Sequence, residues 1–434
     1  MSTTSDVNPG AIAPPEPDLT PEEMIARAVA LRPMLVERQA EAEQRTFYSE
    51  EMHRRFLDAG FYRLYVPRRY GGYEFDLTTY ARVMQELSRG CVSTGWCVAL
   101  ASGHALQIGS WFPESAQSQI FGDGDFRAAC VAAPVGMATR GADGWTLNGK
   151  VSYASGVPYS THYLGQALTR ENVPEGGEPR HLMFVAAREE FTRLDDWGNT
   201  LGLKGSGSHS ITFTDSHLPA NWVLEDTNMV DIDVSGGTPG LRLHGNPLYG
   251  GRAGGPFTVT LAAILVGAAY NALDELENLM RTKVTFLPPQ VLRIYDDDSQ
   301  RWFGEAMARI ALLETAVHGA ARMHMDLCRR AVEQQIPYSY EDDMIVAAIA
   351  REAMLDLWQL MALDIFRAAG SSGAVNGSRL ERVFRDMSMI AGHGNSRLRE
   401  HAHRELARMR FGLSPHGATL EPQAQSAISR GREA

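Results

Sequence analysis

One histidine stands in a setting that favours acid–base chemistry. His104 lies in the run from Thr94 to Trp111, whose other residues are nearly all apolar or small. A neutral imidazole close to its ordinary pKa is well suited to accept a proton from a substrate hydroxyl group. A plainer interpretation stays open, because a single histidine in an apolar helix is more often a hydrogen-bonded core residue.

A second histidine lies between two glycines near the end of the chain. His393 follows Gly392 and precedes Gly394, which suggests a break or a close approach within the last helical segment. The alternative is a histidine at a helix end that interacts with the last carbonyl groups. His401 and His403 follow, but no carboxylate or cysteine partner stands at tight ligand spacing, so we expect no metal site.

Small polar residues and two tryptophans complete the candidates. Ser155 lies in a Ser-Gly turn, and Ser206 and Ser208 alternate with glycines in a loop whose N–H groups would suit an anion. Trp96 and Trp197 are equally consistent with core packing and with stacking on a planar ligand.

Several common functions are excluded by what the sequence lacks. It contains no G-x-G-x-x-G after a strand, no Walker loop, no nucleophile elbow and no HExxH motif, so we expect no nicotinamide dinucleotide site. The formal net charge of −11 argues against a nucleic-acid partner. The apolar stretch Val259–Tyr270 is too short to span a bilayer, so we expect a cytoplasmic protein. The four cysteines show no zinc-type spacing, and in that compartment we expect them to be reduced thiols.

Hydrophobic periodicity predicts three successive parts. Residues 1–20 are predicted to be a disordered tail, 21–125 an N-terminal helical domain, 126–225 a β domain, 226–256 a long loop, 257–413 a C-terminal helical bundle and 414–434 a second tail. Helix starts are expected after Thr20 and at Ser378, where Ser378 and Glu381 would form a capping box. Four long helices joined by short links indicate an antiparallel four-helix bundle, and the fold class is α+β.

This order of parts resembles the acyl-CoA dehydrogenase superfamily. Several segments are similar to its flavin-dependent monooxygenase branch, which includes the oxygenase component of 4-hydroxyphenylacetate hydroxylase. The matching segments are Ser93–Leu100 leading to His104, Phe112–Glu114, Gly144–Gly156, Asp196-Trp197 with Leu201–Ser208, and Leu380–Asp386 followed by His393. Each is moderately specific, and their order and spacing over about residues 40–412 are more so.

The resemblance implies a role for each candidate. His104 would contact and deprotonate the substrate hydroxyl, and His393 would lie on the substrate and peroxide side. Ser155 would bond the flavin N5 region, with Ser152 and Cys130 nearby. The flavin-binding set would comprise Trp96, Cys130, Ser155, Trp197, Ser206, Ser208, Arg385 and Asp386, although Arg385-Asp386 also fits a surface pair on a helix. Relatives often carry serine at the Cys130 position, so part of the substrate-side hydrogen bonding is expected to be missing.

One departure from the family decides between its two branches. Dehydrogenases of the common branch carry a carboxylate base shortly after the last Arg-Asp pair, whereas this chain has Ala391–Ser396 with His393 there. We therefore expect the oxygenase component of a two-component monooxygenase, which hydroxylates an aromatic or phenolic molecule through a C4a-hydroperoxyflavin. Reduced FMN or FAD would come from a separate flavin reductase, O2 would be the co-substrate, and the protein would be a homotetramer. The alternatives are an acyl-CoA dehydrogenase-type flavoprotein and a non-catalytic helical scaffold.

Overall fold

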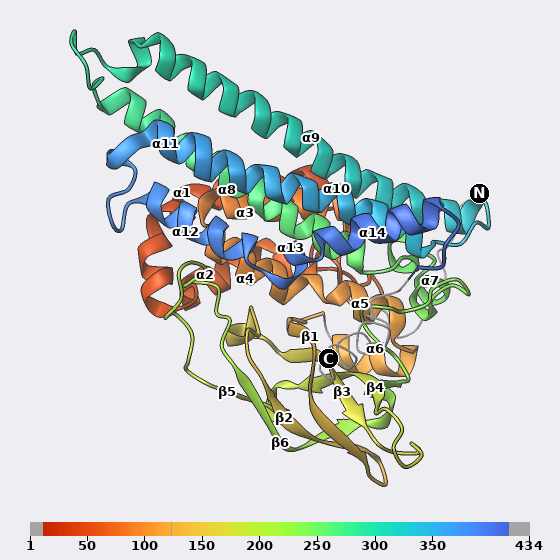
Figure 1. Cartoon of the computed structure of the whole chain (residues 1–434). Helices are drawn as coiled ribbons and strands as arrows, with labels where there is room; N and C mark the ends of the chain where they lie inside the picture. Colours follow the sequence, from red (N-terminus) through yellow and green to blue (C-terminus); the bar gives the residue numbers. More distant parts are fainter. Residues whose placement is uncertain (1–11, 123, 416–434) are drawn as a thin grey trace, which may run out of the picture.

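The computed structural model describes residues 12–122 and 124–415. Helices form the upper layer in Figure 1, and a twisted sheet lies below them. Helices from both ends of the chain build the upper layer together, because α3 and α4 pack against α8. The predicted α+β architecture is confirmed, with the sheet inserted between two helical segments.

The first helical segment begins where the sequence predicts it. Thr20 caps α1 through a complete capping box with Glu23. The single helix expected over Thr94–Trp111 is instead two helices that meet at His104, because that residue takes a ψ of −9° and interrupts the helical backbone. The helices are α1 (Pro21–Arg45), α2 (Glu50–Ala59), α3 (Leu77–Gly90), α4 (Val92–Gly103), α5 (Ala105–Trp111) and α6 (Glu114–Phe121).

One seven-stranded sheet follows in the described part of the chain. Its strand order is β5-β6-β2-β1-β3-β4-β7, and β1 and β3 form its parallel pair. Apolar residues such as Trp145, Phe184 and Phe213 form a core of the sheet's own, separate from the large helical core. The strands are β1 (Ala128–Arg140), β2 (Gly144–Val151), β3 (His162–Thr169), β4 (Arg180–Ala187), β5 (Thr192–Arg193), β6 (Ile211–Pro219) and β7 (Val223–Glu225).

The segment predicted as a long loop contains two short helices. They are α7 (Pro239–His244) and the 3-10 turn Pro247–Gly250, and α8 begins at Gly254. Thr238 caps α7 through its hydroxyl and also donates to the Tyr249 carbonyl, so this connection is held locally by hydrogen bonds.

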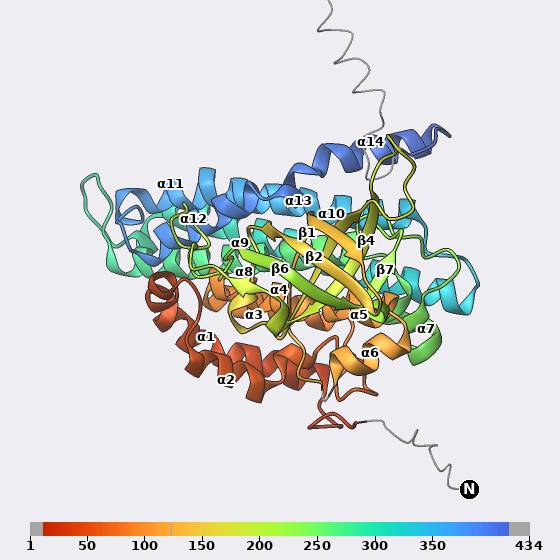
Figure 2. The same ribbon diagram turned by 90° about the horizontal axis from the view of Figure 1, so that it is seen from below.

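The C-terminal helices pack around α8. Figure 2, seen from below, shows the sheet in front of α3, α4 and α8, with α1 and α2 to one side of it. α10 continues through a π-helical turn, Leu360–Ile365. Ser378 caps α12 through its hydroxyl, but the predicted capping box is incomplete, because the Glu381 carboxylate accepts from the Gly377 N–H group and not from that of Ser378. The helices are α8 (Gly254–Thr282), α9 (Asp297–Glu333), α10 (Tyr340–Gln359), α11 (Phe366–Ala369), α12 (Arg379–Ala391), α13 (Gly394–Arg397) and α14 (Arg399–Arg410).

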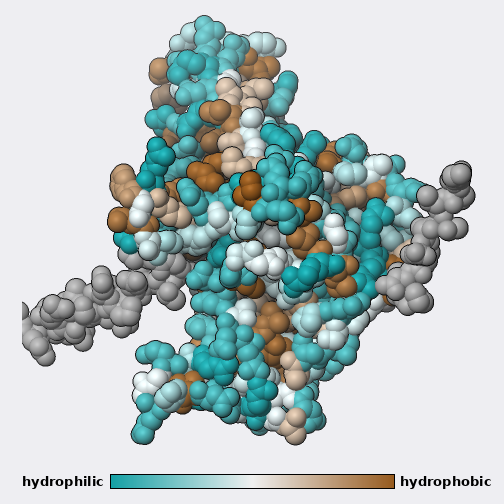
Figure 3. Space-filling model, turned by 90° about the vertical axis from the view of Figure 1, so that its right-hand side faces the viewer, coloured by the Kyte–Doolittle hydropathy of each residue, from teal (hydrophilic) through white to brown (hydrophobic). Residues whose placement is uncertain are grey.

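α8 extends well beyond the apolar stretch Val259–Tyr270 at both ends. Among the described residues it is the one helix with the length and composition to cross a membrane, but 89% of its most apolar window is buried inside the protein. Burial against α3, α9 and α10 explains this composition. On the face shown in Figure 3, apolar side chains form only a broken band between hydrophilic areas.

Candidate active site

His104 occupies the junction of α4 and α5 with a fixed ring orientation. Its Nδ1 atom lies 2.7 Å from the carbonyl oxygen of Ala128, the first residue of β1. Since a carbonyl only accepts, Nδ1 carries the proton in this bond, and Nε2 is the acceptor of the neutral ring. Burial lowers the pKa of His104 to about 4, against a smaller opposing effect of its bonds to backbone carbonyls. The imidazole is therefore neutral near pH 7.

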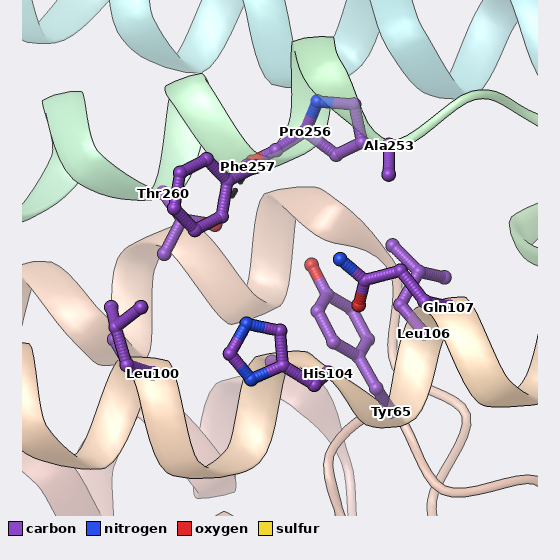
Figure 4. A pocket seen from close by; sticks show the side chains of 11 residues that line it. Tyr65, Leu100, His104, Leu106, Gln107, Ala253, Pro256, Phe257 and Thr260 are labelled. Carbon is purple, nitrogen blue, oxygen red and sulfur yellow. Dashed lines mark hydrogen bonds between the residues drawn. The ribbon is translucent and has the colours of Figure 1, made fainter. Parts of the chain in front are cut away.

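A cavity of about 30 Å³ lies against this histidine, between α4, α5 and the start of α8 (Figure 4). Its lining is mostly apolar, with a few polar groups that converge on the space. The lining residues are Tyr65, Ala99, Leu100, Gly103, His104, Leu106, Gln107, Ala253, Pro256, Phe257 and Thr260. Such an apolar pocket with a small number of placed polar groups is typical of a small-molecule site.

Three serines and one tryptophan form a buried hydrogen-bonded chain. The Trp96 Nε1–H group donates to Ser155 Oγ over 3.1 Å, Ser155 Oγ lies 2.7 Å from Ser208 Oγ, and Ser208 Oγ lies 2.6 Å from Ser206 Oγ. The predicted candidates Trp96, Ser155, Ser206 and Ser208 are thus brought together. A hydroxyl has one donor and two acceptor positions, so the chain keeps free hydrogen-bonding capacity.

Two turns with left-handed backbone place these serines. Gly156 has φ +83°, and a Cβ there would lie 2.9 Å from the Cys97 carbonyl oxygen of α4. Gly207 has φ +61° and packs on Pro158. Glycine is therefore required at both positions, and it lets the Ser155 turn approach α4 closely.

His393 lies beside this chain. Its ring meets the Trp96 ring edge to face, with centroids 5.3 Å apart. It caps the short helix α13, because its Nδ1 atom accepts from the Asn395 N–H group over 3.2 Å. Burial lowers the pKa of His393, so this ring also favours its neutral form. His393 and Trp96 therefore lie together, whereas within residues 12–122 and 124–415 no hydrogen bond or ring contact joins His393 to His104.

Arg385 and Asp386 are inward-facing anchors, and the interpretation as a surface pair is wrong. The Arg385 guanidinium forms ion pairs with Glu43 and Glu381. Asp386 is buried, and its carboxylate accepts from the Leu203 N–H group over 2.6 Å and from the Ser93 hydroxyl over 3.1 Å. Burial raises the pKa of Asp386 to about 6, which these hydrogen bonds partly oppose. Both side chains position α4 and the loop that carries Ser206.

Trp197, Cys130 and Ser152 are less directly connected to the serine chain. Trp197 donates from Nε1 to the Leu203 carbonyl over 2.9 Å. The Cys130 Sγ atom lies 3.7 Å from the sulfur of Met229, and burial raises the pKa of its thiol to about 12. Ser152 is exposed and accepts from the Ser210 hydroxyl. Among the described residues, no hydrogen bond joins any of them to Ser155.

Three polar lining residues were not identified from the sequence: Tyr65, Gln107 and Thr260, whose hydroxyl donates to the Pro256 carbonyl. Gln107 follows His104 by one helical turn, so its presence on the same face was readable from the spacing. Tyr65 lies far earlier in the chain, in a segment without helical or strand periodicity, and no sequence signal pointed to it. Within residues 12–122 and 124–415, no group of three or more His, Cys, Asp or Glu side chains is arranged to hold a metal, and His403 pairs with Glu352.

Comparisons with known proteins agree with this geometry. The acyl-CoA dehydrogenase N-terminal domain matches residues 22–119, and the acyl-CoA dehydrogenase C-terminal domain matches residues 259–397. A pigment production hydroxylase of Rhodococcus sp. is 27% identical over 87% of this chain and 93% of its own length. The oxygenase component of p-hydroxyphenylacetate 3-hydroxylase from Acinetobacter baumannii is 22% identical over 87% of this chain and 86% of its own length.

Solved structures show the same fold. XiaF from Streptomyces sp., in complex with FADH2 and glycerol, has a TM-score of 0.82 at 23% identity and covers 92% of this chain and 98% of its own. The 3-HSA hydroxylase from Rhodococcus sp. has a TM-score of 0.79 at 24% identity, and the match covers 90% of this chain and 97% of the hydroxylase. The chain therefore belongs to the acyl-CoA dehydrogenase superfamily, in its flavin-dependent monooxygenase branch.

Proposed function

We propose that the chain is the oxygenase component of a two-component monooxygenase, which hydroxylates an aromatic or phenolic small molecule. The observation that carries this proposal is His104, a neutral and oriented base that lines a mostly apolar cavity. Among the relatives, one is named for p-hydroxyphenylacetate and another, a hydroxylase of Rhizobium sp., for resorcinol, and both are oxygenase components that act on phenols.

The oriented imidazole supports ionisation of a phenol. With Nδ1 bonded to Ala128, Nε2 of His104 accepts the hydrogen bond of a hydroxyl that enters the cavity. The low pKa of His104 disfavours an isolated imidazolium, but an adjacent phenolate favours the charged ring. The proton therefore moves within a contact ion pair, and the ionised ring becomes more electron-rich at the carbon to be oxygenated.

The serine chain fits the polar edge of a flavin. Reduced FMN or FAD, when bound, supplies the electrons that activate O2. Ser155, Ser206 and Ser208 would hold the heteroatom edge of the ring with their free hydrogen-bonding positions, and Trp96 orients Ser155. Burial of these groups keeps water away from the reacting atoms.

The cavity gives no support to dehydrogenation of an acyl thioester. The short-chain specific acyl-CoA dehydrogenase of Homo sapiens is 26% identical over 52% of this chain. Abstraction of an α-proton by a carboxylate would require Asp or Glu at the reacting centre, and the residues that line the cavity include neither.

The experiment that tests the function separates flavin reduction from oxygenation. The purified chain with NADH, flavin, O2 and resorcinol should not consume NADH, because the sequence has no dinucleotide motif. Addition of an unrelated NADH-dependent flavin reductase should start formation of a hydroxylated product. NADH oxidation by the chain alone, or no oxygenated product from a panel of phenols, would contradict the proposal. We further propose that the protein is cytoplasmic and homotetrameric, and that the reductase acts transiently or by diffusion of flavin.

A further inference from the structure

Two buried polar groups that face the cavity have no partner in the described part of the chain. They are the hydroxyl of Tyr65 and the Oε1 atom of Gln107, in side chains that are only 2% and 7% exposed. Both residues line the cavity beside His104, on the side opposite Leu100 (Figure 4). Buried polar groups in proteins are almost always hydrogen-bonded, so two unpaired groups that converge on one cavity indicate a site for a polar group of a ligand.

The fold fixes the position of the Tyr65 side chain and places Gln107 on the same side of the cavity. The Tyr65 ring stacks on the Tyr80 ring with centroids 4.1 Å apart, and the Tyr80 hydroxyl donates to the Ala99 carbonyl of α4 over 2.7 Å. Burial raises the pKa of Tyr65 well above its usual value, so its hydroxyl remains a neutral donor. Gln107 lies on α5, one turn after His104. A ligand would therefore meet the oriented donor of Tyr65 together with the acceptor of Gln107.

Within the described part of the chain, His104 is the one basic side chain that lines the cavity, and the phenol hydroxyl engages it, so no further cation is left to balance a second negative charge. Its lining contains no Lys or Arg. Arg252 precedes the lining residue Ala253, but its guanidinium donates to the Ile232 carbonyl and pairs with Asp231 over 3.1 Å and with Asp343 over 3.8 Å. A buried carboxylate without a counter-charge is strongly disfavoured.

We infer that Tyr65 and Gln107 form a second recognition point that selects an uncharged substrate, namely a phenol with a second neutral hydrogen-bonding group. His104 binds the phenol hydroxyl, and the pair binds a hydroxyl or carbonyl at another position of the same molecule. This inference rests on the proposed function and names its substrate class. It separates this chain from relatives named for the acids p-hydroxyphenylacetate and indole-3-acetate.

The apolar lining accommodates the ring. A cavity of about 30 Å³ is smaller than the roughly 150 Å³ cavity that takes up benzene, so its walls move apart when a ring enters. Leu100 and Phe257 border the space, and their displacement would be needed to admit a ring. The Tyr65 ring is held by its stacking on Tyr80.

The test compares three ring compounds with the full-length chain. Equilibrium dialysis measures the Kd of 3-hydroxybenzyl alcohol, of phenol and of 3-hydroxybenzoate, which has a carboxylate in place of the alcohol. The parent should bind the alcohol about five- to tenfold more tightly than phenol, as one or two hydrogen bonds would give, and should bind the carboxylate less well than the alcohol. Tyr65→Phe and Gln107→Leu should each reduce the preference for the alcohol to within about twofold.

The matched control is Tyr70→Phe. The Tyr70 hydroxyl is also buried and unpaired, but Tyr70 does not line the cavity, so this variant should keep the parent preference. Equal binding of alcohol and carboxylate, an unchanged preference in both cavity variants, or failure of all three compounds to bind would overturn the inference. Product assays with a flavin reductase on the same compounds distinguish the two proposals. If the compounds are hydroxylated but the alcohol is not bound more tightly than phenol, the proposed function stands and the recognition point is refuted. If the alcohol is bound more tightly but no compound is hydroxylated, the proposed function is refuted and the binding site for an uncharged ring compound stands.

Discussion

Replacement of His104 by alanine tests whether the cavity histidine moves the substrate proton. The variant keeps the serine chain, because no hydrogen bond of Trp96 or Ser155 involves His104. It removes the acceptor at Nε2 and leaves the Ala128 carbonyl without its side-chain donor. Flavin binding should therefore be largely retained while hydroxylation slows.

The size of the effect follows from the ionisation of the substrate. A phenol with a pKa of about 10 is ionised to roughly one part in a thousand at pH 7, and the variant depends on that fraction. We expect hydroxylation to be ~10³-fold slower, within the ~10²–10⁴-fold range for loss of a general base. The rate of the variant should then rise about tenfold per pH unit from pH 7 to 9, as the phenolate fraction rises.

The parent should show a different pH profile. Because burial lowers the pKa of His104 to about 4, the ring stays neutral above about pH 5 and is protonated only as the pH falls towards 4. The parent rate should thus lack a step near the ordinary histidine pKa of about 6.5. Both profiles are measured by mixing enzyme, substrate and chemically reduced flavin with oxygenated buffer and quantifying the product, so that the reductase does not contribute.

His53 provides the matched control for this experiment. Burial also lowers its pKa to about 4, and it stacks on Tyr159 away from the cavity, so His53→Gln should hydroxylate at close to the parent rate. Parent-like hydroxylation by His104→Ala would refute the assignment. A slower rate that stays flat from pH 7 to 9 would also refute proton transfer, because it would show a binding role only.

Two further predictions concern the flavin side and the assembly. Ser155→Ala removes the acceptor of Trp96 Nε1–H and a partner of Ser208. A lost hydrogen bond of roughly 1 kcal/mol should raise the ratio of H2O2 released to product formed about fivefold. An unchanged ratio in a peroxide assay would show that Ser155 is only a turn residue. The exposed apolar side chains Trp302, Met307 and Leu312 on α9 favour burial between subunits, so light scattering should give a homotetramer, and a stable active monomer would contradict this.

The sequence predicted well those features that depend only on neighbouring residues, such as helix caps. The cap at Thr20 and the hydroxyl cap at Ser378 depend on residues within one turn of each helix, and both lie where the sequence places them. The 13-residue strand β1 was not identified in full, because its alternation is blurred by alanines and by irregular pairing with β3. The break at His104 was also missed, since a short interruption leaves the apolar pattern of the helix unchanged.

In the candidate site too, residues that local patterns indicate were predicted, whereas residues that tertiary packing brings together were not. Ser155, Ser206 and Ser208 were proposed from turn and glycine patterns together with the family resemblance, and their mutual bonds stay within one domain. Tyr65 and the ion pairs of Arg385 depend on segments distant in sequence, which periodicity does not connect. Tertiary packing determines both positions. It pairs Arg385 with Glu43 and Glu381, and the role of Arg385 in flavin binding stays a prediction.

Helix α4 explains how these parts act together. Ser93 near its start bonds Asp386 of α12, Trp96 one turn later bonds Ser155 of the β domain, and His104 at its end bonds Ala128 of β1. Trp96 and His104 are eight residues apart, so the helix separates them by roughly 12 Å. Since both the bundle and the β domain hold this helix, the distance between the proposed flavin edge and the proposed substrate base is set by a rigid element. A substitution that loosens either anchor, such as Asp386→Ala, should therefore slow hydroxylation, because it removes the bonds that hold α4 and Leu203 to α12.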